Sequence, residues 1–135
     1  MGVRVSDSPA SVVRKFLESW TDPRTDELRR FLNDDAVWVD GPQGVRRGAN
    51  VIVDELTKQL AIGRDHTVVV DALVADGTTV MVEWHGGFTL GGESISTKVM
   101  AAFEIDANGR INEMRETYDL RSVMDQIEAA GYAVP

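Results

Sequence analysis

The second half of the chain is patterned as a run of long β-strands, and this pattern restricts the fold more than any other feature. From residue 67 onward apolar and β-branched residues recur, and glycine-containing pairs interrupt them. Asp76-Gly77 is a hairpin signal, and Gly86-Gly87 indicates a bulge or bend inside the following strand. The strands expected between the turns are residues 67–75, 78–90, 94–105 and 110–118. This run predicts a strongly curved antiparallel meander.

The first half is patterned as helices around one short strand. Ser8-Pro9 is a helix start, and apolar residues follow on one helical face up to residue 20. The short strand ends at Asp40, before Gly41-Pro42, and residues 44–47 form its returning arm. Further helices are expected from residue 25 or 26 (apolar positions Leu28, Phe31, Leu32), from residue 49 (Val51, Val53, Leu56, Leu60) and over residues 120–129. Helices followed by a meander predict an α+β fold, with helices across the hollow side of the sheet enclosing a pocket.

Composition limits the class of protein and its partners. At 135 residues, with 43% hydrophobic and 27% charged residues, residues 1–135 are expected to form one globular domain. A net charge of -8 argues against nucleic acid and anionic membranes as partners. Cysteine is absent, which excludes disulfides and thiolate chemistry. With no signal-peptide or membrane-spanning pattern, a cytoplasmic location is expected.

Three stretches of the chain resemble the NTF2-like superfamily: the first helix ending at Trp20, the segment DDAVWVDGP with VRRG after it, and NGRINEMRETYDLRSVMDQI. This superfamily includes ketosteroid isomerases, SnoaL-like polyketide cyclases, scytalone-dehydratase-type enzymes and limonene-1,2-epoxide hydrolases. The resemblance implies a cone built from a curved, mixed, mostly antiparallel sheet, with the N-terminal helices over its concave face. It also implies a homodimer, because the convex face of such sheets is often apolar and buried between two copies.

The ketosteroid isomerase resemblance concerns Asp40. In those enzymes the segment that DDAVWVD resembles supplies the general base, and Asp40 stands at the matching position. Their oxyanion-hole positions are occupied here by Phe16 and Ala101, which have no side-chain hydrogen-bond donor. From the residues alone, an Asp before Gly-Pro is interpreted first as a turn cap, with a general base in an apolar pocket as the alternative.

The epoxide hydrolase resemblance concerns the end of the last strand. There the run Arg115–Leu120 places Glu116 at the catalytic carboxylate position. That family also uses an Arg-x-Asp pair on a central strand, which corresponds here to Glu83 and His85. Its Tyr-x-Asn pair on the first strand corresponds to Trp38 and Asp40. The family's full epoxide-opening set is therefore not present.

On these alignments Asp40, Glu83, His85 and Glu116 converge as catalytic residues on one cavity. A histidine among carboxylates can move a proton near neutral pH, and apolar surroundings raise carboxyl pKa values. The residues expected to contact the substrate are Phe16, Trp20, Trp38, Met81, Ala101, Met114 and Tyr118.

The second long strand offers two incompatible orientations. Val80, Val82 and Trp84 share one face, and Met81, Glu83 and His85 share the other. Simple burial turns the first set inward and leaves Glu83 and His85 in water. The resemblance favours the reverse, with the apolar face in a dimer interface and the polar face lining the cavity, and this is the orientation we predict.

The remaining polar residues predict no further site. His66 follows a turn and is expected at the surface, and Arg46-Arg47 is expected as a solvated turn pair. Neither a cofactor nor a bound metal is expected, because His and acidic residues show no ligand spacing.

Three functions remain open at this stage. The first is a cofactor-independent acid–base enzyme of the isomerase, cyclase or dehydratase type, acting on a small, mostly apolar organic substrate. The second is an epoxide hydrolase with a rearranged catalytic set. The third is a binding module without chemistry.

Overall fold

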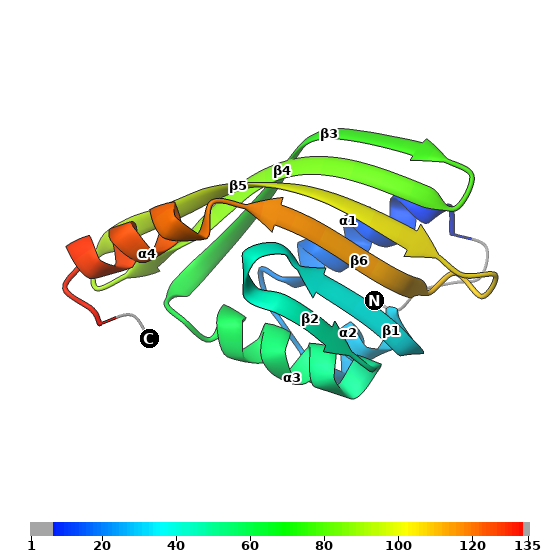
Figure 1. Cartoon of the computed structure of the whole chain (residues 1–135), viewed down its shortest axis with the longest axis horizontal. Helices are drawn as coiled ribbons and strands as arrows, with labels where there is room; N and C mark the ends of the chain where they lie inside the picture. The colour runs from blue at the N-terminus through cyan, green and yellow to red at the C-terminus, as the bar shows by residue number, and fades with distance from the viewer. Residues whose placement is uncertain (1–6, 134–135) are drawn as a thin grey trace.

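The computed structural model of the chain describes residues 7–133 (Figure 1). Its elements follow one another in the order α1 (Pro9–Ser19), α2 (Thr25–Arg30), β1 (Leu32–Asp40), a 3₁₀ turn (Gly41–Gln43), β2 (Gly44–Arg47), α3 (Ala49–Leu60), β3 (Arg64–Asp76), β4 (Thr79–Leu90), β5 (Glu93–Ile105), β6 (Ile111–Tyr118) and α4 (Leu120–Ala129). The predicted α+β class and the order of elements are confirmed.

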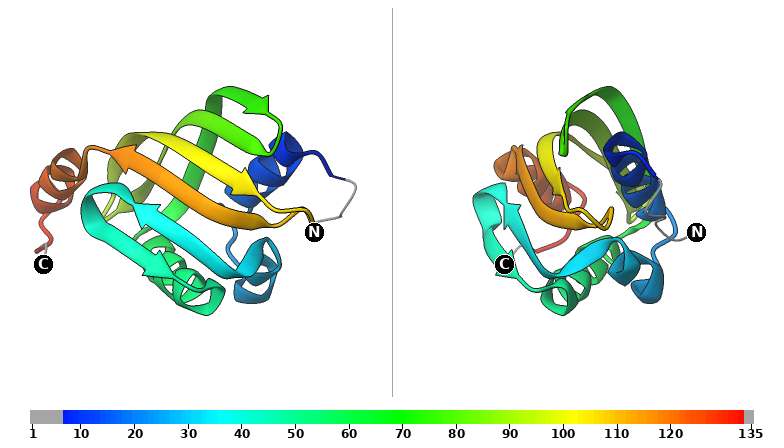
Figure 2. Two further views of the ribbon diagram at one scale, coloured as in Figure 1. Left: turned by 45° about the vertical axis from the view of Figure 1, so that its right-hand side comes forward. Right: turned by 90° about the vertical axis from the view of Figure 1, so that its right-hand side faces the viewer.

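The strands form one six-stranded mixed sheet in the order β2-β1-β6-β5-β4-β3. All neighbouring strands are antiparallel except β1 and β6, which run parallel. The sheet curls around the helices α1, α2 and α3, and α4 lies at one end of it (Figure 2). The chain therefore forms a cone with its core on the concave side.

Strand register decides which side chains enter that core. Trp38 pairs with Met114, Met114 with Phe103, and Phe103 with Val80, so these four side chains lie in one row on the inner face. All four are almost completely buried. Residues one step along each strand point outward, because successive side chains alternate between the faces of a sheet.

The first helix begins as the sequence predicts. The Ser11 backbone N–H donates to the Ser8 hydroxyl at 3.1 Å, and Pro9 stands in the first turn. The second helix ends at Arg30, so Leu32 belongs to β1 instead of the helix in which it was expected. In α3 the expected positions Val53 and Leu56 are buried, whereas Val51 is 52% exposed and Ile52 is buried in its place.

Gly86 and Gly87 lie where neighbouring backbones approach β4 closely. A Cβ atom at Gly86 would lie 2.1 Å from the Thr67 carbonyl oxygen, and one at Gly87 would lie 1.9 Å from the Ile95 carbonyl oxygen. No other residue fits these positions without displacing β3 or β5. The two glycines therefore keep the three strands close together at the end of the sheet that borders the cavity described below.

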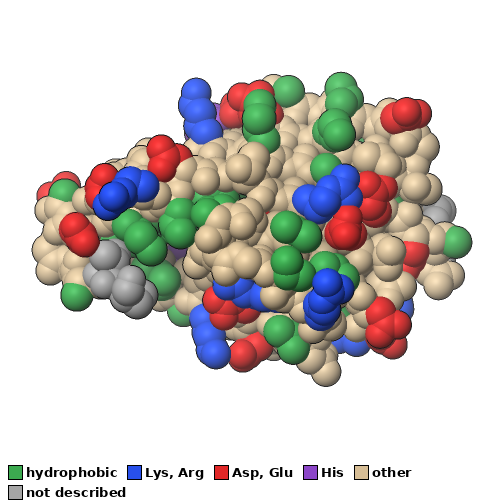
Figure 3. All heavy atoms as spheres, viewed as in Figure 1, with side chains coloured by type: hydrophobic (Ala, Val, Ile, Leu, Met, Phe, Trp, Pro, Cys, Tyr) green, Lys and Arg blue, Asp and Glu red, His purple; other side chains and the backbone are tan. Residues whose placement is uncertain are grey.

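The convex face of the sheet carries apolar side chains that no described residue covers. In Figure 3 hydrophobic side chains are scattered over this face between charged ones. Exposed apolar side chains on this face include Val69, Val74, Met81 and Met100. The predicted homodimer would use this face and stays a prediction. Among the helices of residues 7–133, none is both long enough and apolar enough to cross a membrane.

Candidate active site

A cavity of about 260 Å³ lies on the concave side, between the ends of β3–β6, α3 and α4. Its wall is mostly apolar and aromatic. All three tryptophans of the chain contribute to it, and the polar part of the wall includes Glu116 and Tyr118. The apolar residues of α4 that line it are Leu120, Val123, Met124 and Ile127. A small apolar molecule would be surrounded by aromatic rings in this cavity.

At the polar end of the cavity two carboxyl groups lie side by side. Asp40 ends β1, Glu116 lies near the end of β6, and the two residues are direct partners in the parallel β1–β6 ladder. Their side chains share a hydrogen bond. The Trp38 indole N–H also donates to Glu116 Oε1 at 2.9 Å. Parallel pairing of two strands thus creates an acid pair from residues that are distant in sequence.

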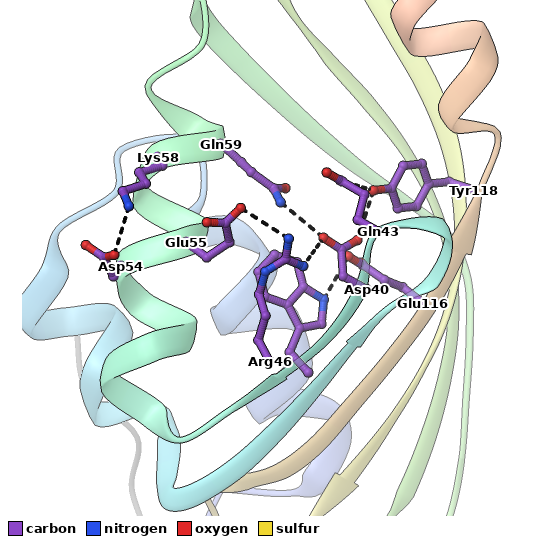
Figure 4. A network of polar contacts seen from close by, with 10 residues as sticks. Asp40, Gln43, Arg46, Asp54, Glu55, Lys58, Gln59, Glu116 and Tyr118 are labelled. Carbon is purple, nitrogen blue, oxygen red and sulfur yellow. Dashed lines mark hydrogen bonds and ion pairs between the residues drawn. The ribbon is translucent and has the colours of Figure 1, made fainter. Parts of the chain in front are cut away.

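Asp40 is completely buried and is held by three donors from different elements (Figure 4). The Tyr118 hydroxyl donates to Oδ1 at 2.9 Å. Arg46 Nη1 at 2.6 Å and Gln59 Nε2 at 3.1 Å both donate to Oδ2. The interpretation as a turn cap is wrong, since the Asp40 side chain makes no capping hydrogen bond to the 3₁₀ turn that follows it.

Arg46 compensates the negative charge of Asp40. Its guanidinium lies over the Trp38 ring, 5.0 Å from the ring centroid, and its second nitrogen binds Glu55 at 3.2 Å. The Arg46 side chain is only 17% exposed, so its assignment to a solvated turn pair was wrong. The cause is the β1–β2 register, which pairs Arg46 with inward-facing Trp38.

The environment of the pair holds a proton on Glu116. Burial, and then the neighbouring charge of Asp40, raises the pKa of Glu116 to about 8. Burial likewise raises the pKa of Tyr118, so its hydroxyl remains a hydrogen-bond donor. At neutral pH Glu116 is therefore largely protonated, and it is the carboxyl group in contact with the cavity.

Two of the four predicted catalytic residues are elsewhere. Glu83 and His85 lie on the outer face of β4, because Val80, Val82 and Trp84 occupy the inner face. The His85 side chain is 48% exposed, and its Nδ1 lies 2.8 Å from Asp71. Met81, expected to contact the substrate, is 54% exposed on the same outer face. The predicted orientation of this strand is wrong, and simple burial of its apolar face gives the observed one.

The other predicted residues divide between the cavity and the core. Trp20, Trp38, Tyr118 and Glu116 line the cavity. Asp40 is absent from the cavity wall, because the side chains that bind it surround it. Phe16, Ala101 and Met114 face inward but belong to the core, where the Phe16 ring contacts the rings of Trp20, Phe31 and Phe103.

Several residues of the site were not predicted. Gln43, Gln59, His66 and Phe88 line the cavity, and His66 is half-buried instead of being at the open surface. The helix over residues 120–129 was predicted, but nothing in the sequence showed that its apolar residues would border a cavity. Among residues 7–133, no group of three or more His, Asp or Glu side chains is arranged to hold a metal ion.

Comparison with known proteins agrees with this fold. The model of the SnoaL-like domain matches residues 13–114. An LEH-like epoxide hydrolase from M. tuberculosis has 22% identity and a TM-score of 0.77, over 90% of each chain. A putative SnoaL-like polyketide cyclase from Shewanella putrefaciens CN-32 has 17% identity and a TM-score of 0.78, over 90% of this chain and 86% of the other.

A third similar structure is SalBIII, an epoxide hydrolase/cyclase-like enzyme in pyran ring formation of the polyether salinomycin. It has 16% identity and a TM-score of 0.75, over 84% of this chain and 92% of the other. No curated protein matches the sequence. At such identities the structural similarities establish the fold alone, whereas the domain match spans most of the chain. The chain belongs to the SnoaL-like family of the NTF2-like superfamily.

Proposed function

We propose that this chain is a cofactor-independent acid–base enzyme of the isomerase, cyclase or dehydratase type, acting on a small, mostly apolar, uncharged molecule. One observation carries the proposal: the carboxyl group of Glu116 contacts an apolar cavity and has a pKa of about 8. Such a group is protonated at neutral pH and can donate its proton in a site where water is scarce.

In the proposed reaction Glu116 donates its proton to an oxygen atom of the bound molecule. The carboxylate that remains keeps the hydrogen bond from the Trp38 indole N–H. Ring closure or isomerisation then releases a proton from another atom of the same molecule, and the acid pair takes it back. No net proton is gained or lost, and a positioned donor of this kind contributes about 10²–10⁴-fold in rate.

Asp40 has a different role here from the general base expected from the sequence. Its oxygens already accept hydrogen bonds from Arg46, Gln59 and Tyr118, and Asp40 itself is fully buried and does not line the cavity. Its negative charge favours protonation of the neighbouring Glu116. Asp40 is therefore a positioning residue that keeps the proton on Glu116.

The cavity wall supports an uncharged substrate. Besides Glu116, which is neutral when protonated, the polar wall near the acid pair consists of Gln43, Gln59 and Tyr118. A charged molecule would lose its hydration in this wall without a buried counter-ion, and that loss is costly. An apolar molecule with an accessible oxygen would instead gain aromatic contacts and one strong hydrogen bond.

Epoxide hydrolysis is a second candidate, because the same protonated carboxyl could protonate the oxygen of an epoxide. The similarity to proteins described as epoxide hydrolases supports this candidate only at the level of the fold. His85 cannot assist epoxide opening in this cavity, because it lies on the outer face of the sheet.

One probe tests the proposal and separates the two reactions. We would incubate the protein in H₂¹⁸O with 5-phenyl-4,5-epoxypentan-1-ol, whose pendant hydroxyl can close a ring. Attack by that hydroxyl gives a cyclic ether without ¹⁸O, and attack by water gives a labelled triol. Chromatography with mass detection identifies either product.

Three proteins are compared: the unaltered chain, Glu116→Gln, and Glu83→Gln as a matched control on the outer face. We expect Glu116→Gln to lower the rate at least about 100-fold and Glu83→Gln to leave it unchanged. Binding of the probe is followed by the fluorescence of the three tryptophans that line the cavity. Binding without any product would reject the proposal and indicate a binding module.

A further inference from the structure

The start of β3 carries a histidine that the proposed reaction does not use. His66 lines the same cavity as Glu116, is half-buried, and packs on Phe88 with ring centroids 5.1 Å apart. Gly63 allows this packing, because a Cβ atom at that position would lie 2.4 Å from the Phe88 ring. The imidazole is thus enclosed on one side and belongs to the cavity wall.

A β-bulge sets the direction of the His66 side chain. Arg64 pairs with Thr89 and Thr67 pairs with Gly87, so two residues of β3 stand opposite the single residue Phe88 of β4. One of these two, Asp65, has a φ of 55° and is the only non-glycine residue with positive φ among residues 7–133. Such a bulge redirects a side chain at the edge of a sheet, commonly beside a functional site.

Hydrogen bonding fixes the tautomer of His66. Its Nε2 lies 3.1 Å from the Ile62 carbonyl oxygen, and a carbonyl can only accept. Nε2 of the neutral ring therefore carries the hydrogen, and Nδ1 is an acceptor. Nδ1 has no hydrogen-bond partner among the described residues.

The charged groups near His66 leave this acceptor available to a ligand. On its own strand Arg64 and Asp65 form an exposed ion pair with each other at 3.9 Å. The residues that contact the ring from other segments, Phe88 and Ile62, are uncharged. Glu116 is the other acid–base group of the cavity wall, apart from the tyrosine hydroxyl that binds Asp40.

We propose that Nδ1 of His66 is a second polar anchor of the cavity and accepts a hydrogen bond from an O–H or N–H group of the ligand. The substrate class is then bifunctional. It has an acceptor oxygen for the proton of Glu116 and a hydrogen-bond donor at another point of an otherwise apolar skeleton. The acceptor oxygen of the ligand rests on the proposed function of Glu116, whereas its hydrogen-bond donor rests on His66 alone.

Two isosteric probes test the donor end. One is 6-amino-2-acetylnaphthalene, which carries a carbonyl acceptor and an N–H donor. The other is 6-methyl-2-acetylnaphthalene, which has the same shape without the donor. Kd values are measured at pH 7.5, about one unit above the ordinary imidazole pKa of 6.5 and below the value of about 8 for Glu116, through quenching of tryptophan fluorescence.

The variant His66→Phe keeps an aromatic ring against Phe88 and removes the acceptor. His85→Phe, on the outer face, is the matched control. We expect the preference of the unaltered chain for the amino over the methyl probe to fall about fivefold in His66→Phe. We expect His85→Phe to keep that preference.

A second measurement does not depend on any variant. The ¹⁵N resonance of His66 Nδ1 should shift when the amino probe binds and stay in place when the methyl probe binds. An unchanged preference, an unmoved resonance, or the failure of both probes to bind would overturn the inference. If the unaltered chain prefers the amino probe but does not convert the epoxide, only the proposed function is refuted.

Discussion

Replacement of Glu116 by Gln should stabilise the fold, and the gain should grow with pH. In the unfolded chain this carboxyl ionises near its ordinary pKa of 4.5, whereas in the folded protein its pKa is about 8. The folded state therefore holds a proton that the unfolded state releases between these two values. Below pH 4.5 this group has no effect on stability, and as pH rises toward 8 it increasingly destabilises the fold.

The size of the effect follows from the same two values. One pKa unit corresponds to about 1.4 kcal/mol, so at pH 7 protonation of Glu116 in the fold costs about 3 kcal/mol. A glutamine amide can keep both contacts of the protonated acid, accepting from the Trp38 indole and donating to Asp40. It cannot ionise, so this cost disappears.

Urea unfolding of the two proteins at several pH values measures the difference. From pH 5 to pH 7 the free energy of unfolding of Glu116→Gln should rise relative to the unaltered chain by roughly 2–3 kcal/mol. Glu83→Gln, on the outer face, should show no such trend. Two stability curves that remain parallel from pH 5 to pH 8 would refute the idea that the fold holds a proton on Glu116.

Three further predictions concern the surroundings of the acid pair and the outer face. Arg46→Met leaves Asp40 buried without its cation and should lower the free energy of unfolding by about 3–5 kcal/mol, with a smaller loss for Arg46→Lys. Gly86→Ala forces a methyl group against the Thr67 carbonyl and should lower Tm by several degrees in a thermal scan; an unchanged Tm would contradict the close approach of β3 and β4. Met100→Lys charges the apolar outer face and should convert the predicted homodimer to a monomer in light scattering, and a monomeric unaltered chain would reject the dimer itself.

Local signals in the sequence predicted most of the elements. The start of α1 was predictable because the Ser8 hydroxyl caps the helix and Pro9 fits its first turn. Both contacts involve residues no more than four positions apart. The face of β4 was also readable locally, since Val80, Val82 and Trp84 are the apolar set and are buried. The prediction failed when the resemblance to other families was allowed to override this alternation.

The candidate site was less accessible from sequence, because its contacts are long-range. Glu116 was found through the resemblance of its surrounding run. Arg46 and Gln59 were missed, because their role depends on the β1–β2 register and on how α3 lies against β1. His66 was missed because the bulge that aims it depends on strand pairing, which no local pattern of the chain shows.

The central position of the last strand has a consequence for the order of folding. β6 joins β1 to β5, so the β1–β2 hairpin and the β3–β5 meander remain separate until it docks. The hydrogen bond between Trp38 and Glu116 joins residues 78 positions apart in sequence. Contacts between such distant residues form slowly during folding, so we expect the docking of β6 to be a slow step. Docking must also bury Glu116 with its proton, so refolding should slow at alkaline pH. During synthesis the acid site can form only after β6 has emerged from the ribosome.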